Sequence, residues 1–499
     1  MDSLAHLMAG FSAAMTPAYL TYALIGCIFG TLIGVLPGLG PAAGTAILIP
    51  ITFKLDPTGA IIMLAAIYYG AMYGGTITSV LLNVPGEAAS VITCLDGHQM
   101  AKQGRGGTAL GIAAIGSFVG GLFATVALVL VAPPLAKFAL TFGPPEYFAL
   151  MVFGLCLVSG LAGKSLAAAM VMTAFGLIIS LIGIDPVRGA PRFTFSVPEL
   201  YDGLGVVPVV MGLFGIAEIL ITAEQRSRDM IRTSFKGLFP SRAEWRRSWG
   251  AIARGTGIGF FLGLIPGIGA IVPTFMSYIV EKRVSKTPEE FGNGAIEGVA
   301  GPETANNAYA NAAMVPFLTL GIPSSPTIAV LMGAFIINGL TPGPFLFQER
   351  PDLVWTVIAS FFIGNVMLLV LNLPLVGLWA KILEVPFKYL AVGVLLFCIM
   401  GAYSLKQSPF DVWVMLGFGV LGYLFRKVNL PVAPLVLGLI LGPAIETSLR
   451  TSLEMSAGDF GILAERPLCL GLLIASALVL AASALSLAPR ALREGEAEV

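Results

Sequence analysis

One interrupted apolar motif occurs twice in this chain. The sequence Gly-Val-Leu-Pro-Gly-Leu-Gly at 34–40 returns 229 residues later as Gly-Leu-Ile-Pro-Gly-Ile-Gly at 263–269. Both copies lie in strongly apolar surroundings, where a Pro-Gly pair interrupts a helix. A chain with this pattern is expected to fold as two similar halves that contain discontinuous helices.

Composition places the chain in a lipid bilayer. Hydrophobic residues make up 57% and charged residues 11% of the sequence, and the mean hydropathy is +0.89. Soluble domains carry roughly 25% charged residues. Apolar stretches long enough to cross the membrane as helices recur along the chain, without the alternation of a β-barrel. The expected fold is an all-α polytopic membrane protein with two repeats, broken helices, re-entrant hairpins and about 10–12 transmembrane helices.

The longest polar stretch divides the chain into its parts. Residues 224–254 contain eight basic and three acidic residues, which predicts a cytoplasmic linker. The expected organisation is a first transmembrane repeat over 1–223, the basic linker over 224–254, a second repeat over 255–450, and an extra helix with a tail over 451–499. The formal net charge of zero argues against a nucleic-acid binder.

Charged loops indicate how the two halves are oriented. The early loop has one cation in the first half, Lys54, and three in the second half, whereas the later loop has two in the first half and one, Arg350, in the second. Opposite biases in equivalent loops favour an inverted topology.

Each half contains one further break, and this second pair of breaks predicts an anion site. A helix that reaches Asn83 should end at Pro85-Gly86, and a new helix should begin near Glu87. In the second half, Ser325 is the expected N-cap of a new helix. Free N–H groups at a helix N-terminus bind carboxylates, although each segment also fits an ordinary loop. The candidate substrate-binding residues are Asn83, Pro85, Gly86, Ser90, Thr93, Thr319, Pro323, Ser324, Ser325 and Thr327.

Ionisable and amide residues near the breaks are candidates for binding a coupling cation, Na+ or H+. A charge in the membrane is costly and usually functional, and unwound carbonyl groups or amide oxygens suit Na+. Simpler interpretations are a helix end at the water interface for Asp96 and a polar surface loop for residues 297–311. The candidate coupling residues are Pro37, Gly38, Asp96, Pro266, Gly267, Glu303, Asn306, Asn307 and Asn311.

The chain resembles the large membrane (permease) subunit of the tripartite tricarboxylate transporter family. The resemblance covers almost the whole chain and rests on motifs in both halves: Tyr69-Gly70, Tyr73-Gly74-Gly75, Asn83-Val84-Pro85-Gly86, Ser90, Thr93, Asp96-Gly97, Met100-Ala101, Gly301-Pro302-Glu303 and Gly321-Ile322-Pro323.

The resemblance implies a multi-pass permease of the bacterial inner membrane. It implies work with a small four-helix membrane subunit and a periplasmic binding protein that delivers a carboxylate such as citrate. It also implies import driven by a cation gradient. We expect alternating access around a site made by residues 83–96 and 319–327. The sequence has no GxxxxGK[ST] phosphate loop, which agrees with transport that does not use ATP. The substrate and a homo-oligomeric state are left open.

Other functions fit the sequence less well. Broken helices also build channels, so an anion channel stays an alternative, as does a scaffold subunit of a membrane complex. An enzyme is not expected, because the two histidines, His6 and His98, and the five cysteines form no metal or catalytic motif, and no organic cofactor is indicated.

The inverted topology makes a direct prediction. Single cysteines at Lys54 and Lys282, each introduced into a cysteine-free background, should be labelled from opposite sides of the membrane by an impermeant thiol reagent. Labelling of both positions from the same side would contradict the inverted arrangement.

Overall fold

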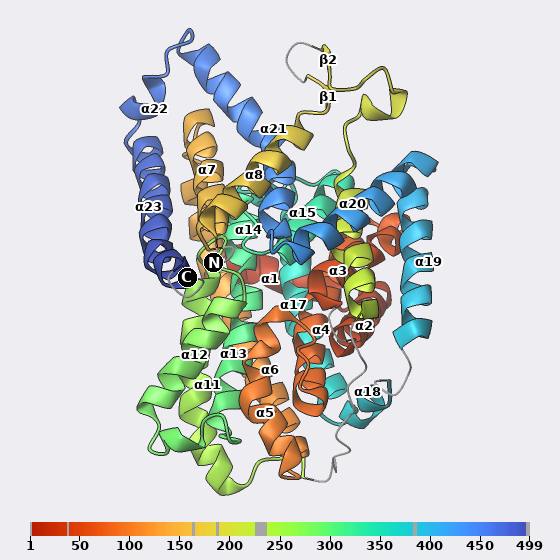
Figure 1. Cartoon of the computed structure of the whole chain (residues 1–499), viewed down its shortest axis with the longest axis vertical. Coiled ribbons are helices and arrows are strands. Elements are labelled where there is room, and N and C mark those ends of the chain that lie inside the picture. The colour runs from red at the N-terminus through yellow and green to blue at the C-terminus, as the bar shows by residue number, and fades with distance from the viewer. Residues whose placement is uncertain are drawn as a thin grey trace.

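The computed structural model describes residues 2–36, 39–161, 165–185, 189–224, 237–382 and 387–495. Helices account for nearly all of the secondary structure in these ranges, and many of them run along the long axis of the molecule (Figure 1). One two-stranded antiparallel sheet, β1 (Gly183–Ile184) with β2 (Pro191–Arg192), lies at one end. The expected all-α class is therefore confirmed.

The first half of the chain is a series of helices. They are α1 (Asp2–Ala14), α2 (Pro17–Val35), α3 (Gly40–Leu48), η1 (Ile49–Lys54), α4 (Pro57–Leu82), η2 (Ala88–Val91), α5 (Thr93–Lys102), α6 (Gly106–Ala139), α7 (Pro144–Leu161), α8 (Leu166–Ser180), η3 (Pro198–Leu200), α9 (Val206–Val210), the π-helix η4 (Met211–Ile216) and α10 (Ala217–Glu224).

The rest of the chain is also a series of helices, and it ends in the long helix α23. Its elements are α11 (Arg242–Gly263), α12 (Ile271–Val284), η5 (Pro288–Glu290), α13 (Glu297–Ala312), α14 (Met314–Leu320), α15 (Pro326–Ile337), α16 (Leu346–Glu349), α17 (Pro351–Asn372), α18 (Val376–Ile382), α19 (Phe387–Lys406), α20 (Pro409–Lys427), α21 (Val432–Met455), α22 (Ile462–Glu465) and α23 (Pro467–Gly495).

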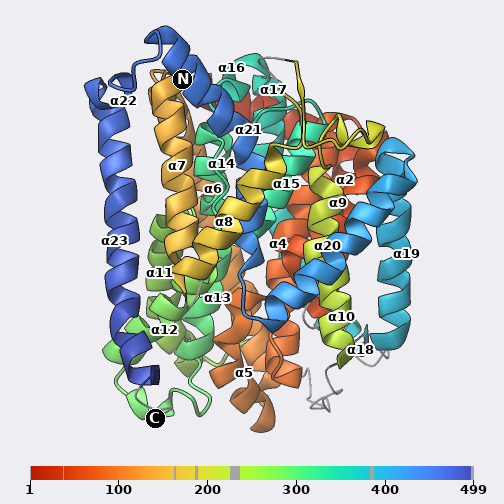
Figure 2. The same cartoon turned by 45° about the horizontal axis from the view of Figure 1, so that its top comes forward.

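Seven helices in the described ranges are long and apolar enough to cross a membrane, and four shorter helices are also apolar. α4 is buried along its whole most apolar stretch, whereas α23 is mostly exposed and runs along the outer edge beside α7 (Figure 2). The protein is therefore polytopic, with α4 at its centre and α23 at its periphery.

The basic segment before the second half differs from a simple linker. α11 begins at Arg242 and continues without a break across residue 254, the expected end of the linker. A capping box explains this start, because Ser241 Oγ accepts a hydrogen bond from Glu244 N–H while the Glu244 carboxylate accepts one from Ser241 N–H. Residues 225–236 lie outside the described part of the chain.

Glycines allow α2 to pack closely on α4. A Cβ atom on Gly26, Gly30 or Gly34 would lie 2.5, 2.5 or 2.3 Å from the carbonyl oxygen of Met63, Ile67 or Ala71, respectively. These distances are too short for a real Cβ, so only glycine permits the approach. Small residues at helix contacts are a common way to bring helices together in membranes.

The same arrangement occurs between α11 and α13. Gly255, Gly259 and Gly263 each lie 229 residues after their counterparts on α2, and a Cβ there would lie 2.3, 2.3 or 3.0 Å from the carbonyl oxygen of Gly301, Ala305 or Tyr309. The spacing of the three contacts along α13 equals the spacing along α4. The two helix pairs therefore pack in the same register, although the orientation of one half relative to the other stays a prediction.

Helices of each half pack against helices of the other half. α6 of the first half packs on α13 of the second, and α17 of the second half packs on α4 of the first. In the same way, α8 packs on α21, and α20 packs on η4. The central helices α4 and α13 are thus each held between elements of both halves.

The glycine contacts give a stability prediction with an internal control on one helix. Gly259→Ala should lower the melting temperature, because its Cβ would lie 2.3 Å from Ala305 O and overpacking costs about 1–3 kcal/mol. Gly257→Ala, two residues earlier, meets nothing within 4 Å and should keep or raise stability, since Ala favours helix by about 1 kcal/mol. Thermal unfolding of the purified variants in detergent compares them, and equal melting temperatures would contradict the close packing.

Candidate functional site

α4 and α14, the short helix that follows α13, end in the same way. The C-cap of α4 is Asn83, which adopts the left-handed conformation with φ 54°, and the C-cap of α14 is Gly321 with φ 70°. Asn and Gly are the residues that best tolerate this C-terminal conformation. Pro85 and Pro323 each follow two residues later. A proline after the C-cap cannot continue the helix.

A new helical segment starts directly after each break, as the sequence predicts. Glu87 is the N-cap of η2, which leads into α5, and its Oε2 accepts a hydrogen bond of 3.1 Å from Ala89 N–H. Ser325 is the N-cap of α15, and its Oγ accepts one of 3.3 Å from Ile328 N–H. These caps leave other N–H groups of the first turn free of helical partners.

In the first half, the two breaks lie side by side. A Cβ on Gly86 would lie 2.1 Å from Gly34 O, so the Pro85-Gly86 turn packs directly on the C-terminal end of α2. Pro37 and Gly38, expected to bind the coupling cation, lie outside the described residues. α2 ends at Val35 and α3 begins at Gly40.

The two breaks of the second half are also adjacent. α11 ends at Gly263 and α12 begins at Ile271, with Gly267 and Gly269 between them at φ 83° and 70°. α7 contacts both breaks, since a Cβ on Gly267 would lie 2.8 Å from Val158 N and one on Gly154 would lie 3.0 Å from Ile322 Cγ2. Pro266, next to Gly267, is buried.

One face of α13 joins the breaks of the two halves. Asn306 Nδ2 donates a 2.7 Å hydrogen bond to Glu87 Oε1 in the first half. Tyr309 OH donates one of 3.0 Å to Ser324 O in the second half. Residues three apart lie on the same face of a helix, so the chain segments after both breaks converge on α13.

Glu303 occupies the same face of α13 and binds the first half. Its side chain is 1% exposed and accepts hydrogen bonds from two hydroxyls, Thr76 Oγ1 at 2.6 Å and Thr93 Oγ1. Glu303 therefore joins α13 to both α4 and α5. The simpler interpretation of this segment as a polar surface loop is wrong, because every residue from Glu297 to Ala312 is buried in α13.

The asparagines of α13 extend this polar face toward α6. Asn307 Nδ2 donates to Ser117 Oγ at 2.7 Å, and Asn311 Oδ1 accepts from Thr125 Oγ1 at 3.2 Å. The side-chain oxygens of Asn306 and Asn307 are buried without a hydrogen-bond partner in the described structure. Unpartnered buried acceptors are costly, so these two oxygens are suited to a cation or a water molecule.

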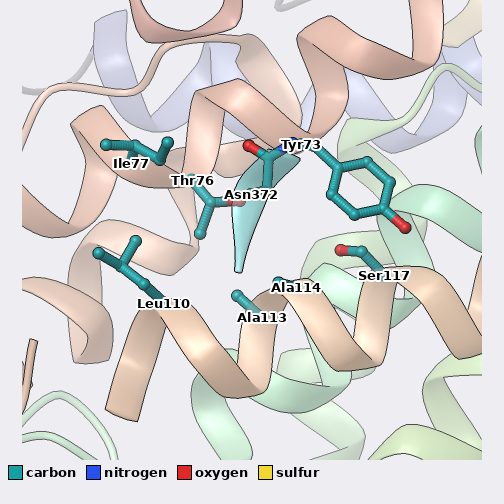
Figure 3. A pocket seen from close by; sticks show the side chains of 8 residues that line it. All are labelled: Tyr73, Thr76, Ile77, Leu110, Ala113, Ala114, Ser117 and Asn372. Atoms are coloured by element: carbon teal, nitrogen blue, oxygen red, sulfur yellow. The ribbon is translucent and has the colours of Figure 1, made fainter. Parts of the chain in front are cut away.

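A small cavity lies beside Glu303, between α4, α6 and α17 (Figure 3). Thr76 and Asn372 point into it from one side, and Ala113 and Ala114 close it from α6. Its complete lining is Tyr73, Thr76, Ile77, Leu110, Ala113, Ala114, Ser117 and Asn372. The space suffices for about one water molecule.

Asp96 has a complete set of donors. Its Oδ1 accepts from the N–H groups of Gly292, Gly294 and Ala295 at 2.8, 2.8 and 2.9 Å, and its Oδ2 accepts from Tyr278 OH at 2.9 Å. These four hydrogen bonds tie α5 to α12 and to the loop before α13. A role of Asp96 in coupling stays a prediction.

The remaining predicted substrate-binding residues differ in exposure and in whether their hydroxyl groups are already hydrogen-bonded. Asn83 is exposed at its break, whereas Pro323, Ser325 and Thr327 are buried at theirs. Four predicted hydroxyl groups already donate internally: Ser90 to Glu87 O, Thr93 to Glu303, Thr319 to Val315 O and Ser324 to Ala313 O.

Several residues of this cluster were not predicted from the sequence. Thr76, Ser117 and Asn372 lie within long apolar helices, where single hydroxyl and amide groups resemble ordinary packing residues. Their partners Glu303 and Thr31 lie at least 186 residues away in the sequence, so only the tertiary structure shows the contacts. Tyr309 in α13 likewise resembles a packing residue. The sequence placed Glu87 at the start of the helix after the first break, but not among the candidate site residues.

Comparison with known proteins identifies the family. The model of the tripartite tricarboxylate transporter TctA family matches residues 20–437. The chain belongs to this family. It is 46% identical over 474 residues, 95% of the chain and 94% of the relative, to an uncharacterised 52.8 kDa protein of the TAR-I ttuC′ 3′ region of Agrobacterium vitis.

A shorter relative agrees with this assignment. An uncharacterised protein of the TAR-II ttuC′ 3′ region of Agrobacterium vitis is 48% identical over 215 residues, which are 43% of this chain and 89% of that protein. No solved structure matches the chain. This TctA family member is thus a multi-pass membrane component of a transport system.

Proposed function

We propose that this TctA family member is the permease subunit of a binding-protein-dependent secondary transporter that imports tricarboxylates or related organic acids. The observation that supports this most is the convergence of both interrupted helices on one face of α13. Paired broken helices with their ends in the protein interior form the substrate sites of secondary transporters.

The substrate site proposed here lies between the starts of α5 and α15. Helix N-termini favour carboxylates without a basic residue, and Asn83 at the first break is exposed to a ligand. Ser325 accepts from Ile328 N–H, so its own hydroxyl proton can be donated to a substrate oxygen. A polyanion held by both ends would contact the two halves at once.

The coupling cation, Na+ or H+, would bind next to this site. Glu303, Asn306 and Asn307 lie within two turns of α13, and the unpartnered amide oxygens supply the hard ligands that Na+ prefers. Alternating access then follows if the halves change their relative position and carry the bound groups from one side of the membrane to the other.

The proposed setting follows from the family name and the resemblance. The permease would lie in the bacterial inner membrane with a small four-helix membrane subunit, and a periplasmic binding protein would deliver the carboxylate. It would act as a carrier without enzymatic activity. A channel is the second candidate, favoured only by the backbone-lined breaks.

Substitution at the breaks tests the substrate site. Asn83→Ala and Ser325→Ala should each abolish carboxylate uptake in reconstituted liposomes, because each removes a polar group at a break. Assembly with the membrane partner, measured by size-exclusion chromatography, should stay intact, because loss of the N-cap at Ser325 costs only about 1 kcal/mol and an alanine in the left-handed conformation of Asn83 costs about 1–2 kcal/mol.

Ser408→Ala is the matched control. Ser408 also caps a helix, accepting from Phe410 N–H at 3.2 Å, but at the start of α20. This variant should lose a similar amount of stability and keep its uptake. Wild-type uptake by both Asn83→Ala and Ser325→Ala would remove these residues from the substrate site.

A further inference from the structure

Most buried carboxylates in this fold have an arginine partner. Glu146, Asp185, Glu218, Glu281 and Glu297 all form ion pairs of this kind, with Arg466, Arg450, Arg426, Arg254 and Arg247, respectively. Such pairing offsets the cost of removing a charge from water. A buried carboxylate without a cation beside it therefore needs another explanation.

Glu87 and Glu303 have no basic partner among the described residues. Their side chains are 6% and 1% exposed. All of their hydrogen-bond donors are uncharged: Asn306 and the Ala89 N–H for Glu87, and Thr76 and Thr93 for Glu303. Hydrogen bonds of this kind replace only part of the hydration of two charges.

The two carboxylates are neighbours where α4, η2 and α13 meet. A Cβ built on Gly75 would lie 2.8 Å from Glu87 Cγ, while the next residue, Thr76, binds Glu303. On α13, Asn306 binds Glu87 and lies three residues after Glu303. Two carboxylates that share a buried site without a counter-charge cannot both stay ionised.

The surrounding titratable groups do not supply that counter-charge. Asp96 on α5 is saturated by its own four donors, and Arg254 on α11 pairs with Glu281 of α12. His98 on α5 hydrogen-bonds through Nδ1 to Val80 O. Five tyrosines also lie on these packed elements and carry no positive charge: Tyr68, Tyr69 and Tyr73 on α4, Tyr278 on α12 and Tyr309 on α13. Glu297, at the start of α13, pairs with Arg247, and Lys102 lies in the last turn of α5. α6 and α15 contribute the hydroxyl groups of Ser117 and Ser325 to this region.

Thr76 connects Glu303 to the water-sized cavity beside α4. Thr76 binds Glu303 and also lines the cavity, and Asn372 lines it from α17 (Figure 3). The side chain of Asn372 is 4% exposed, and its Oδ1 has no hydrogen-bond partner in the described structure. A water molecule in the cavity would satisfy this oxygen and reach the Thr76 hydroxyl.

We propose that Glu87 and Glu303 share an exchangeable proton at the boundary between the halves, and that this proton exchanges with water in the cavity through Thr76. The inference identifies the coupling ion as a proton, and in this respect it rests on the proposed carrier function. It assigns the coupling role to a carboxyl pair and makes Thr76 and Asn372 the access route.

The exchange balances as a simple proton transfer. A hydronium in the cavity gives a proton to the Thr76 hydroxyl as that hydroxyl gives its own proton to Glu303, so one O–H bond forms at the carboxylate and one breaks in the hydronium. The Asn306 amide suits either state of Glu87. Its Nδ2 donates to the carboxylate, and after a rotation of the amide its Oδ1 accepts from the carboxylic acid.

Infrared spectroscopy of the purified protein in liposomes tests the proposal without transport. Near neutral pH in choline buffer, wild type minus the Glu87→Gln/Glu303→Gln double variant should show the C=O band of a protonated carboxyl group. Glu349→Gln, which changes an exposed carboxylate, should give no such band in its difference spectrum. The melting temperature of the double variant shows that it is folded, because glutamine keeps the shape of the protonated acid.

Deuterium exchange of that band tests the route. Thr76→Val should slow the exchange by about tenfold or more, because it removes the relay hydroxyl, and Thr76→Ser should restore the wild-type rate. An unchanged rate in Thr76→Val would overturn the cavity route.

Other outcomes overturn the shared proton itself. A wild-type spectrum without the band, or a band that sodium removes, would show that the pair is ionised or holds Na+ instead. A band without any carboxylate uptake by the complete system would leave the proton site standing and refute the carrier function, and uptake without the band would do the reverse.

Discussion

The central interaction in this protein is the set of hydrogen bonds that α13 sends to the first half. The Glu303 carboxylate accepts hydrogen bonds from the Thr76 and Thr93 hydroxyls, and the Asn306 amide donates one to the Glu87 carboxylate. These groups are buried, so each bond left unmade would cost about 1–3 kcal/mol. The position of α13 against α4 and α5 is therefore specified by polar contacts, which lipid-like apolar packing alone would not define.

Close glycine packing makes that polar contact possible. α4 and α13 are each approached by a glycine-rich helix of their own half, α2 or α11, at distances that no side chain would allow. Each pair brings one break beside another, as the packing of Gly86 on Gly34 shows. Helix packing and the site therefore depend on each other. Small residues allow the helix backbones to approach closely, and the breaks expose polar groups where those backbones meet.

The sequence predicted the features that depend on local chemistry. The break after Asn83 and the N-cap Ser325 follow from Pro, Gly and Ser at known positions of helix ends, and the structure contains both. The start of α11 was missed although Ser241 and Glu244 form a recognisable capping box, because the surrounding basic residues resembled a linker.

Features that depend on tertiary contacts were not predictable. Thr76 in α4 looks like any small residue of an apolar helix, and its bond to Glu303 joins positions 227 residues apart. The same holds for Asn372, whose place beside the cavity depends on the packing of α17 on α4. The segment 297–311 is a polar stretch that also fitted a surface loop, and its burial could not be predicted from its composition.

The most direct measurement is uptake of labelled carboxylate by liposomes that contain this chain with its small membrane partner and a ligand-loaded binding protein. We expect accumulation against a concentration gradient that requires the binding protein and an inward cation gradient. A proton gradient alone should suffice if the Glu87–Glu303 pair carries the coupling ion. Uptake that only equilibrates the carboxylate under both proton and sodium gradients would contradict a carrier and favour a channel.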